Sequence, residues 1–379
     1  MKIILIGGAR PNFMKIAPLM QAIDKHNTMG TGENIRAMLV HTGQHYAYEM
    51  SQVFFRDLNL PRPDIHLGVG SGTHAEQTAK AMVELERIFA HEKPDLVMVV
   101  GDENSTLGAV LAAAKTGIPI THVEAGLRSF DRSMPEEINR ILTDAVADYL
   151  FVSSPQAEEN LKREGIAPGK IFMAGSVTAD SLLYILSRVA ESHMLKELSL
   201  EKGQYILVTL HRASNVDDKE VLFKLIQAFV TVSRRKPIVF PIHPRTKNSI
   251  EQYGLKRFLE EGNIRFLEPL GYLDFVQLEK NAALVMTDSG GLQEETTLLD
   301  IPCLTLREVT EWPITINKGT NTLVGNDTQR IVAAAESILS GSIKTGRRPA
   351  YWDGRAAQRI IACVAQAGRT RRPTDVAMP

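Results

Sequence analysis

Short, continuous apolar runs recur along the first half of the chain, separated by turn residues and by segments whose apolar residues have helical spacing. The runs cover residues 2–6, 37–41, 96–100, 118–123, 149–152 and 171–174. Runs of this kind are typical of strands that are buried on both faces, as in a parallel sheet. The segments between them include three predicted helices, at residues 13–23, 76–89 and 110–115. The pattern predicts a parallel, doubly wound α/β sheet.

The same alternation restarts after residues 177–203, which we expect to form a polar helical connection. Five further apolar runs cover residues 205–210, 237–240, 264–267, 283–287 and 302–306, and a closing helix is predicted around residues 355–367. We therefore expect two Rossmann-like domains, 1–176 and 177–354, with the C-terminal segment (about 355–379) packing back onto the first. Two such domains facing a cleft would offer a small-molecule site.

Composition narrows the class of partner. The chain has 379 residues, with 43 basic and 44 acidic side chains. This balance gives no argument for nucleic acid or for an anionic membrane surface. The only cysteines are Cys303 and Cys363, and the sequence shows no secretion leader and no long apolar run. A cytoplasmic location is expected. No Cys/His cluster has metal-site spacing, so neither a metal nor a cofactor is expected.

A glycine turn follows the first predicted strand. Gly7 and Gly8 precede a predicted helix that carries Arg10 and Lys15 near its start. A strand, a glycine turn and a helix N-terminus together make an anion site. The turn is not GxGxxG, so it is weak evidence for a dinucleotide. Solvated surface cations are the alternative interpretation.

Carboxylates cluster in residues 122–140 and at Asp102. Glu124 is expected just past a strand's carboxyl end, and Pro135 is expected to open a helix with Glu136 and Glu137 in its first turn. Carboxylates with cations alongside allow one group to act as an acid and another as a base. Surface ion pairs that cap a strand and a helix are the alternative, but the whole stretch favours a site.

Residues 288–295 contain the more specific phosphate signal. Gly290 and Gly291 lie at a predicted strand-to-helix turn, where backbone N–H groups can approach an anion, and Ser289 adds a hydroxyl. Glu295, one turn into the helix, suits the hydroxyls of a ribose. The pattern predicts a diphosphate with an attached ribose; a tight turn before a capped helix is the alternative.

Two histidines, His211 and His243, also end predicted strands. They are able to steady phosphates or the sugar, although a lone histidine at such a place is often only a satisfied polar residue.

The chain resembles the non-hydrolysing UDP-N-acetylglucosamine 2-epimerases from Gly7 to about Gly325. The resemblance rests on eight motifs, at residues 8–15, 42–45, 101–102, 122–128, 135–140, 211–212, 287–295 and 319–321. It implies the glycosyltransferase-B architecture, a UDP-sugar ligand and a homodimer.

The resemblance also implies residue roles. Asp102, Glu124 and Glu136 would be the catalytic carboxylates, with His211 both in the catalytic set and in contact with the UDP-sugar. The other implied UDP-sugar contacts are Arg10, Lys15, Ser289, Gly290, Gly291 and Glu295, with Phe275 near the base. Gln44, Glu137, Arg212 and His243 match a regulatory UDP-sugar site found in some members.

The implied reaction is epimerisation at carbon 2 by elimination and re-addition of UDP. Trp312 and Leu270 replace an arginine and a glutamine that the family often has, and Arg307 is a candidate substitute for the arginine. The alternatives are a 2-epimerase for a UDP-2,3-diacetamido uronic acid, a hydrolysing epimerase, a glycosyltransferase of the same architecture and a non-catalytic sensor.

Overall fold

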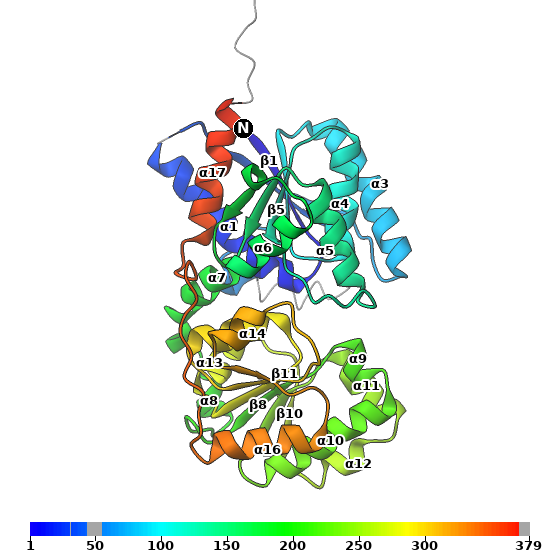
Figure 1. Ribbon diagram of the computed structural model, residues 1–379, viewed down its shortest axis with the longest axis vertical. Helices are drawn as coiled ribbons and strands as arrows, with labels where there is room; N and C mark the ends of the chain where they lie inside the picture. Colours follow the sequence, from blue (N-terminus) through cyan, green and yellow to red (C-terminus); the bar gives the residue numbers. More distant parts are fainter. Residues whose placement is uncertain (31, 44–54, 371–379) are drawn as a thin grey trace, which may run out of the picture. The chain divides into compact units, whose positions relative to one another are not determined.

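The computed structural model describes residues 1–30, 32–43 and 55–370, except for the side chains of Arg10 and of residues 368–370. Within these residues the chain forms two compact units (Figure 1). Unit 1 comprises Met1–Leu183 together with the segment that begins at Ala350, and unit 2 comprises Tyr184–Pro349.

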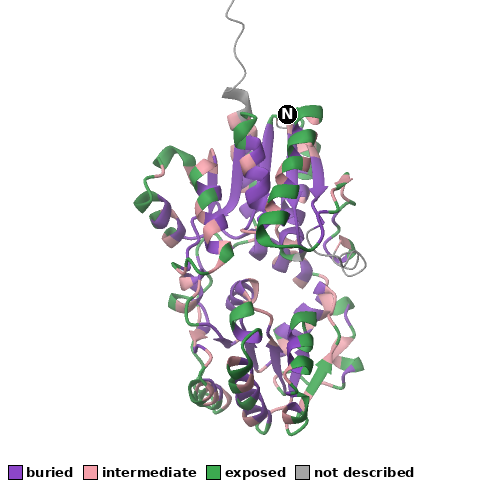
Figure 2. Ribbon diagram, turned by 90° about the vertical axis from the view of Figure 1, so that its right-hand side faces the viewer, coloured by how far each residue is buried: buried purple, intermediate pink, exposed green. Residues whose placement is uncertain are grey.

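Unit 1 is built on a seven-stranded sheet in the order β3-β2-β1-β4-β5-β6-β7. Its strands are β1 (Lys2–Gly7), β2 (Arg36–His41), β3 (Ile65–His66), β4 (Leu96–Val100), β5 (Ile120–Ala125), β6 (Tyr149–Val152) and β7 (Ile171–Met173). Every pairing is parallel. The purple central strands of Figure 2 show that the middle of this sheet is buried on both faces, which explains its continuous apolar runs.

Helices cover both faces of this sheet. They are α1 (Arg10–Met29), α3 (His74–Glu92), α4 (Asn104–Lys115), α5 (Pro135–Val146), α6 (Pro155–Arg163), α7 (Val177–Leu186), α17 (Ala356–Thr370) and the 3-10 turn η1 (Pro168–Lys170). The first and last helices, α1 and α17, pack against each other, whereas α3, α4 and α5 pack in series (Figure 1).

The start of α7 differs from the expected polar connection. Val177 and Leu182 are fully buried. Asp180 accepts hydrogen bonds from the backbone N–H groups of Ala356 (3.1 Å) and Ala357 (2.8 Å). Residues 177–183 therefore lie with unit 1, because their apolar side chains complete its core and Asp180 caps α17.

Unit 2 has a six-stranded, all-parallel sheet in the order β10-β9-β8-β11-β12-β13. Its strands are β8 (Ile206–Thr209), β9 (Ile238–Pro241), β10 (Ile264–Leu267), β11 (Leu284–Thr287), β12 (Cys303–Thr305) and β13 (Asn321–Leu323). Its helices are η2 (Val189–Glu191), α8 (Met194–Glu197), α9 (Ala213–Val216), α10 (Lys219–Ser233), α11 (Pro244–Gln252), α12 (Lys256–Leu259), α13 (Tyr272–Asn281), α14 (Gly290–Leu299), α15 (Pro313–Asn317) and α16 (Thr328–Leu339).

The strand orders locate a switch point in each sheet. The order reverses between β1 and β4 in unit 1 and between β8 and β11 in unit 2. Ligands of open α/β sheets bind at the carboxyl ends of strands beside such a point. The two parallel, doubly wound sheets confirm the expected fold class.

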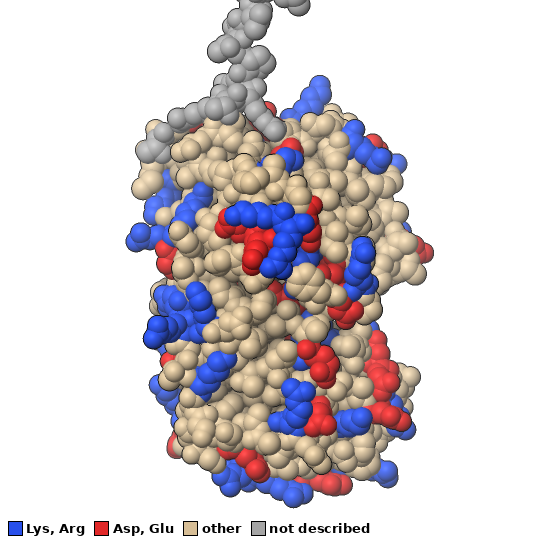
Figure 3. Space-filling model, in the orientation of Figure 1, with Lys and Arg blue, Asp and Glu red and all other residues tan. Residues whose placement is uncertain are grey.

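The surface matches the balanced composition. Basic and acidic side chains are interspersed on the face shown in Figure 3. None of the helices within the described residues combines the length and the hydrophobicity that a membrane-spanning segment requires.

Candidate active site

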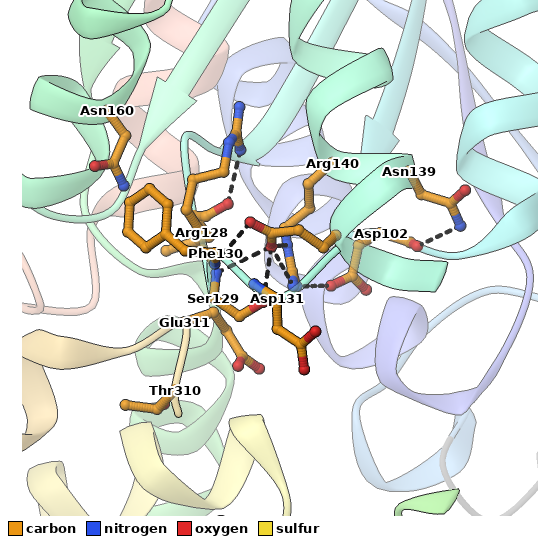
Figure 4. A network of polar contacts seen from close by, with 12 residues as sticks. Asp102, Arg128, Ser129, Phe130, Asp131, Asn139, Arg140, Asn160, Thr310 and Glu311 are labelled. Carbon is orange, nitrogen blue, oxygen red and sulfur yellow. Dashed lines mark hydrogen bonds and ion pairs between the residues drawn. The ribbon is translucent and has the colours of Figure 1, made fainter. Parts of the chain in front are cut away.

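Asp102 follows β4 at the switch point of unit 1 and is held by Arg140 of α5. The Arg140 Nη1 atom lies 2.5 Å from Asp102 Oδ2, and the Asp102 side chain is 30% exposed (Figure 4). Asn139 donates a hydrogen bond to the Asp102 carbonyl over 2.9 Å. Two residues of one helix turn thus fix both the backbone and the carboxylate of Asp102, while leaving the carboxylate accessible.

Glu137 is the buried partner of the same arginine. Its Oε2 lies 2.9 Å from Arg140 Nη2, and its side chain is 1% exposed. It also accepts hydrogen bonds from the backbone N–H groups of Ser129 and Phe130, each over 2.9 Å. Glu137 therefore anchors the loop before α5, so its carboxylate is engaged within unit 1. The regulatory role implied for it stays a prediction.

Glu124 lies inside β5. The sequence had led us to expect it just past the end of the strand. The register of β5 against β6 shifts between Val123 and Ala125, and Glu124 has φ of 70°. This bulge places a 4% exposed carboxylate in an ion pair with Lys15 Nζ. A bulge beside an active site commonly re-aims one side chain. The bulge cannot be recognised in the sequence, because apolar residues flank Glu124 on both sides.

Glu103 is a candidate that the sequence analysis missed as a site residue. Its Oε2 is buried and meets no hydrogen-bond donor among the described residues. A Cβ on Gly8 would lie 2.9 Å from this atom, so the turn before α1 packs directly on the carboxyl group. Burial, followed by the charges of Asp102 and Glu136, raises the pKa of Glu103 to about 8 against the opposing charge of Lys15. Glu103 is thus a neutral acid among carboxylates at pH 7.

His122 has a structural position. It is fully buried, with Nδ1 2.6 Å from Asp144 Oδ1 and Nε2 2.9 Å from the Gly101 carbonyl. Burial alone would raise the pKa of Asp144, but His122 and Arg128 together lower it. Arg128 also pairs with Glu164 at 2.6 Å. Through the contact of His122 with the Gly101 carbonyl, this group of residues supports the Gly101–Asp102 turn.

In unit 2, Asp288 organises the ends of β8 and β11. It is fully buried and accepts hydrogen bonds from the backbone N–H of His211 (3.0 Å) and of Arg212 (2.8 Å). Its Oδ1 lies 2.9 Å from His211 Nδ1. Burial opposes ionisation, but the charge and hydrogen bonds of His211 and the Arg212 N–H hold the pKa of Asp288 at about 2. These bonds orient the His211 ring, and its centroid lies 5.5 Å from the ring centroid of His243.

Ser289 is the N-cap of α14, and Gly290 and Gly291 form its first turn. A Cβ on Gly290 would lie 2.7 Å from Glu311 Oε1, whereas one on Gly291 would meet nothing nearer than Ser289 Oγ at 3.9 Å. Gly290 thus makes room for a protein carboxylate, and Gly291 leaves open space at a helix N-terminus, where anions bind.

Glu295 and Phe275 are both almost fully buried within unit 2. Glu295 is 1% exposed, and Tyr272 Oη donates to its Oε1 over 2.6 Å. Phe275 is 8% exposed and belongs to the apolar cluster on one face of the unit 2 sheet. The ligand contacts implied for these two residues stay predictions.

A buried ion pair lies just before Trp312 in the chain. Glu311 pairs with Arg307 at 2.7 Å and lies 3.6 Å from Arg212. Trp312 itself is 3% exposed. The guanidinium of Arg307 is therefore engaged by Glu311, which limits it as a substitute for the arginine that Trp312 replaces.

The remaining candidates are only partly described. Arg10 is the first residue of α1, but its side chain is outside the described set, and Gln44 lies outside the described residues. Glu136 is half-buried in the first turn of α5.

Known proteins match this chain over nearly its full length. The family model described as UDP-N-acetylglucosamine 2-epimerase matches residues 27–365. A UDP-N-acetylglucosamine 2-epimerase of Methanocaldococcus jannaschii is 42% identical over 95% of this chain and 98% of its own. A UDP-2,3-diacetamido-2,3-dideoxy-D-glucuronate 2-epimerase of Pseudomonas aeruginosa is 41% identical over 97% of this chain and 100% of its own.

A solved structure shows the same architecture. The M. jannaschii UDP-GlcNAc 2-epimerase in complex with UDP-GlcNAc and UDP aligns with a TM-score of 0.89 at 42% identity, covering 97% of this chain and 100% of that one. The paired strand-end carboxylates, the glycine turn of α14 and these full-length similarities lead to one conclusion. The chain belongs to the UDP-N-acetylglucosamine 2-epimerase family.

Proposed function

We propose that this protein is a UDP-N-acetylglucosamine 2-epimerase, which interconverts UDP-N-acetylglucosamine and UDP-N-acetylmannosamine. The observation that carries the proposal is the pair of carboxylates at the carboxyl ends of the neighbouring strands β4 and β5 of unit 1. Asp102 is paired with Arg140, and Glu124 is paired with Lys15. Full-length relatives with this activity and a homologue structure with bound UDP-GlcNAc support it.

The chemistry needs two acid–base groups and a leaving-group site. A base removes the carbon-2 proton as the bond between carbon 1 and the diphosphate oxygen breaks, so UDP departs and a 2-acetamidoglycal remains. UDP then re-adds to carbon 1 while an acid returns a proton to the opposite face of carbon 2. Asp102 and Glu124, with Glu136 alongside, are the groups we assign to these proton transfers, each worth about 10²–10⁴-fold in rate.

Unit 2 supplies the features that a departing diphosphate needs. The Ser289–Gly291 turn presents backbone N–H groups at the start of α14, and His211 lies beside it at the end of β8. Hydrogen-bond donors placed where negative charge develops are commonly the largest single term in catalysis. We assign the diphosphate to this turn and the ribose to Glu295.

Proton NMR in deuterated water tests the function directly. With UDP-N-acetylglucosamine as the sole substrate, deuterium should appear at carbon 2 and the manno isomer should accumulate. Free UDP with free N-acetylmannosamine would identify a hydrolysing enzyme instead. Turnover only after an acceptor is added would identify a glycosyltransferase, and UDP binding with no turnover would identify a sensor.

The same assay should be run with a second substrate, because the Pseudomonas aeruginosa relative is almost as similar to this chain as the M. jannaschii relative is. Faster carbon-2 exchange with a UDP-2,3-diacetamido uronic acid than with UDP-N-acetylglucosamine would assign the protein to that reaction. Both sugars share the acetamido group at carbon 2, so the elimination chemistry is the same.

We further propose a homodimer in the cytoplasm, which light scattering and cell fractionation can test.

A further inference from the structure

Three buried side-chain amides form a hydrogen-bonded network beside the Asp102 turn in unit 1. They belong to Gln77 of α3, Asn104 of α4 and Asn139 of α5, whose exposed fractions are 9%, 5% and 5%. Asn104 Nδ2 donates to Gln77 Oε1 over 2.8 Å, and Asn139 Nδ2 donates to Asn104 Oδ1 over 3.2 Å. This amide network therefore joins three helices that are separate in the sequence.

Both ends of the amide network bond to the backbone. At one end, Asn139 Nδ2 donates its second hydrogen to the Asp102 carbonyl over 2.9 Å (Figure 4). At the other end, Gln77 Nε2 donates to the Gly70 carbonyl over 3.1 Å. The Gly70 N–H in turn donates to the carbonyl of Gly43, which follows β2, over 2.9 Å. The network thus links the turn that carries Asp102 to a glycine loop beside the end of β2.

Close packing of α3 against α4 supports the network. A Cβ on Gly108, one turn after Asn104, would lie 2.9 Å from the Thr78 carbonyl oxygen, so the missing side chain lets the two helices approach each other. Asn104 Nδ2 also lies 3.0 Å from His74 Nδ1, in addition to its bond to Gln77. Because α3 accepts both N–H groups of Asn104, it fixes the direction in which the Asn104 carbonyl oxygen faces α5.

Hydrogen bonds between buried amides restrain orientation more than they stabilise the fold. The net free energy of such a bond is small, whereas its length and angle vary within narrow limits. A group that exchanges a proton with carbon must lie within hydrogen-bond reach of it and in the right direction. A network that ends on the Asp102 carbonyl is suited to hold Asp102 in that way.

We propose that Gln77 and Asn104 are positioning residues for Asp102, which they orient through Asn139. The inference rests on the proposed function only in taking Asp102 as a proton-transfer group. Loss of the Gln77 oxygen would leave one N–H of Asn104 without its acceptor. The Asn104 amide could then rotate, and the bond from Asn139 to the Asp102 carbonyl would lose its fixed geometry.

The decisive comparison is between Gln77→Glu and Gln77→Met. Glutamate keeps an oxygen that accepts from Asn104, whereas methionine has a similar length and no such acceptor. We expect kcat for carbon-2 exchange to stay within about twofold in Gln77→Glu and to fall about tenfold in Gln77→Met. KM and the UDP affinity, measured by calorimetry, should stay unchanged in both variants. Lys80→Met, on the exposed side of α3, is the matched control.

A double-mutant cycle shows whether Gln77 acts through Asn139. If it does, Gln77→Met combined with Asn139→Leu should be no slower than Asn139→Leu alone, because the second change removes the link on which the first depends. Losses of kcat that multiply would overturn the proposal, as would a Glu variant at position 77 that is as slow as the Met variant.

Amide hydrogen exchange gives a readout that needs neither activity nor the variant at Asn139. Peptides covering residues 101–107 should exchange faster in Gln77→Met than in Gln77→Glu and in the unchanged protein. Equal exchange in all three proteins would overturn the proposal. If the unchanged protein shows no carbon-2 exchange with either UDP-sugar, the proposed function fails, and hydrogen exchange still decides whether the amide network holds the Asp102 turn.

Discussion

Arg140 and Asp102 form a 2.5 Å ion pair that joins the first turns of α5 to the end of β4. The same guanidinium bonds the buried Glu137, so one arginine connects a structural carboxylate to an accessible one. The accessible carboxylate is held in one orientation, as a group that transfers a proton to or from carbon requires.

We expect Asp102→Asn to lower turnover by about 10²–10⁴-fold, because the amide keeps the shape of the side chain but cannot exchange a proton at carbon 2. The UDP affinity should stay unchanged, because Asp102 belongs to unit 1, whereas the residues to which we assign the diphosphate and the ribose belong to unit 2. Initial rates by NMR and UDP titration by calorimetry measure the two quantities. Glu86→Gln, an exposed carboxylate on α3, is the control. A loss confined to UDP binding would contradict the assigned role.

Glu103 should make stability depend on pH between about pH 4.5 and pH 8. The folded protein retains the Glu103 proton up to a pKa of about 8, whereas the unfolded chain loses it near the ordinary value of 4.5. Between these values the folded state binds more protons, so this group's contribution to the free energy of unfolding falls as pH rises and then levels off. Urea unfolding from pH 5 to pH 9 should show a shallower decline for Glu103→Gln. An identical decline in both proteins would rule out a protonated Glu103.

The two glycines of α14 should respond differently to alanine. A methyl group at Gly290 would push the Glu311 carboxylate away from Arg307, and we expect a loss of about 1–3 kcal/mol in the free energy of unfolding. At Gly291 the space is open, and alanine should stabilise the helix by up to about 1 kcal/mol. Gly291→Ala should nonetheless weaken UDP binding if the diphosphate contacts this turn. Urea unfolding and UDP titration separate the effects, and normal UDP affinity in Gly291→Ala would argue against that contact.

His122→Phe should affect both stability and turnover. It removes the bonds to Asp144 and to the Gly101 carbonyl, and leaving these buried groups with fewer partners should cost about 2 kcal/mol. The Gly101–Asp102 turn would loosen, so turnover should fall while the UDP affinity stays the same. Thermal unfolding and NMR rates measure the outcome, with the exposed His91→Gln as control. Turnover unaffected by the substitution would show that the turn holds without this support.

Local patterns predicted several strands well. The bounds expected for β4 and β6 agree with the structure to the residue, because their continuous apolar runs end sharply at polar or turn residues, and the bounds expected for the partly exposed β10 agree as well. The start of α5 at Pro135 was also predicted, since proline and acids favour a first turn. The edge strands β3 and β13 were missed, because two or three residues carry no periodicity.

The order of the residues is enough to predict two doubly wound sheets and the polar residues that follow their strands, because strand burial and turn chemistry are local properties of the chain. What those polar residues do depends on the folded structure. It placed His122 against Asp144 inside unit 1, turned Glu124 through a bulge towards Lys15, and buried a carboxyl oxygen of Glu103 where it meets no hydrogen-bond donor among the described residues. The charge state of a carboxyl group depends on burial and on neighbours that are distant in sequence, and these exist only once the chain has folded.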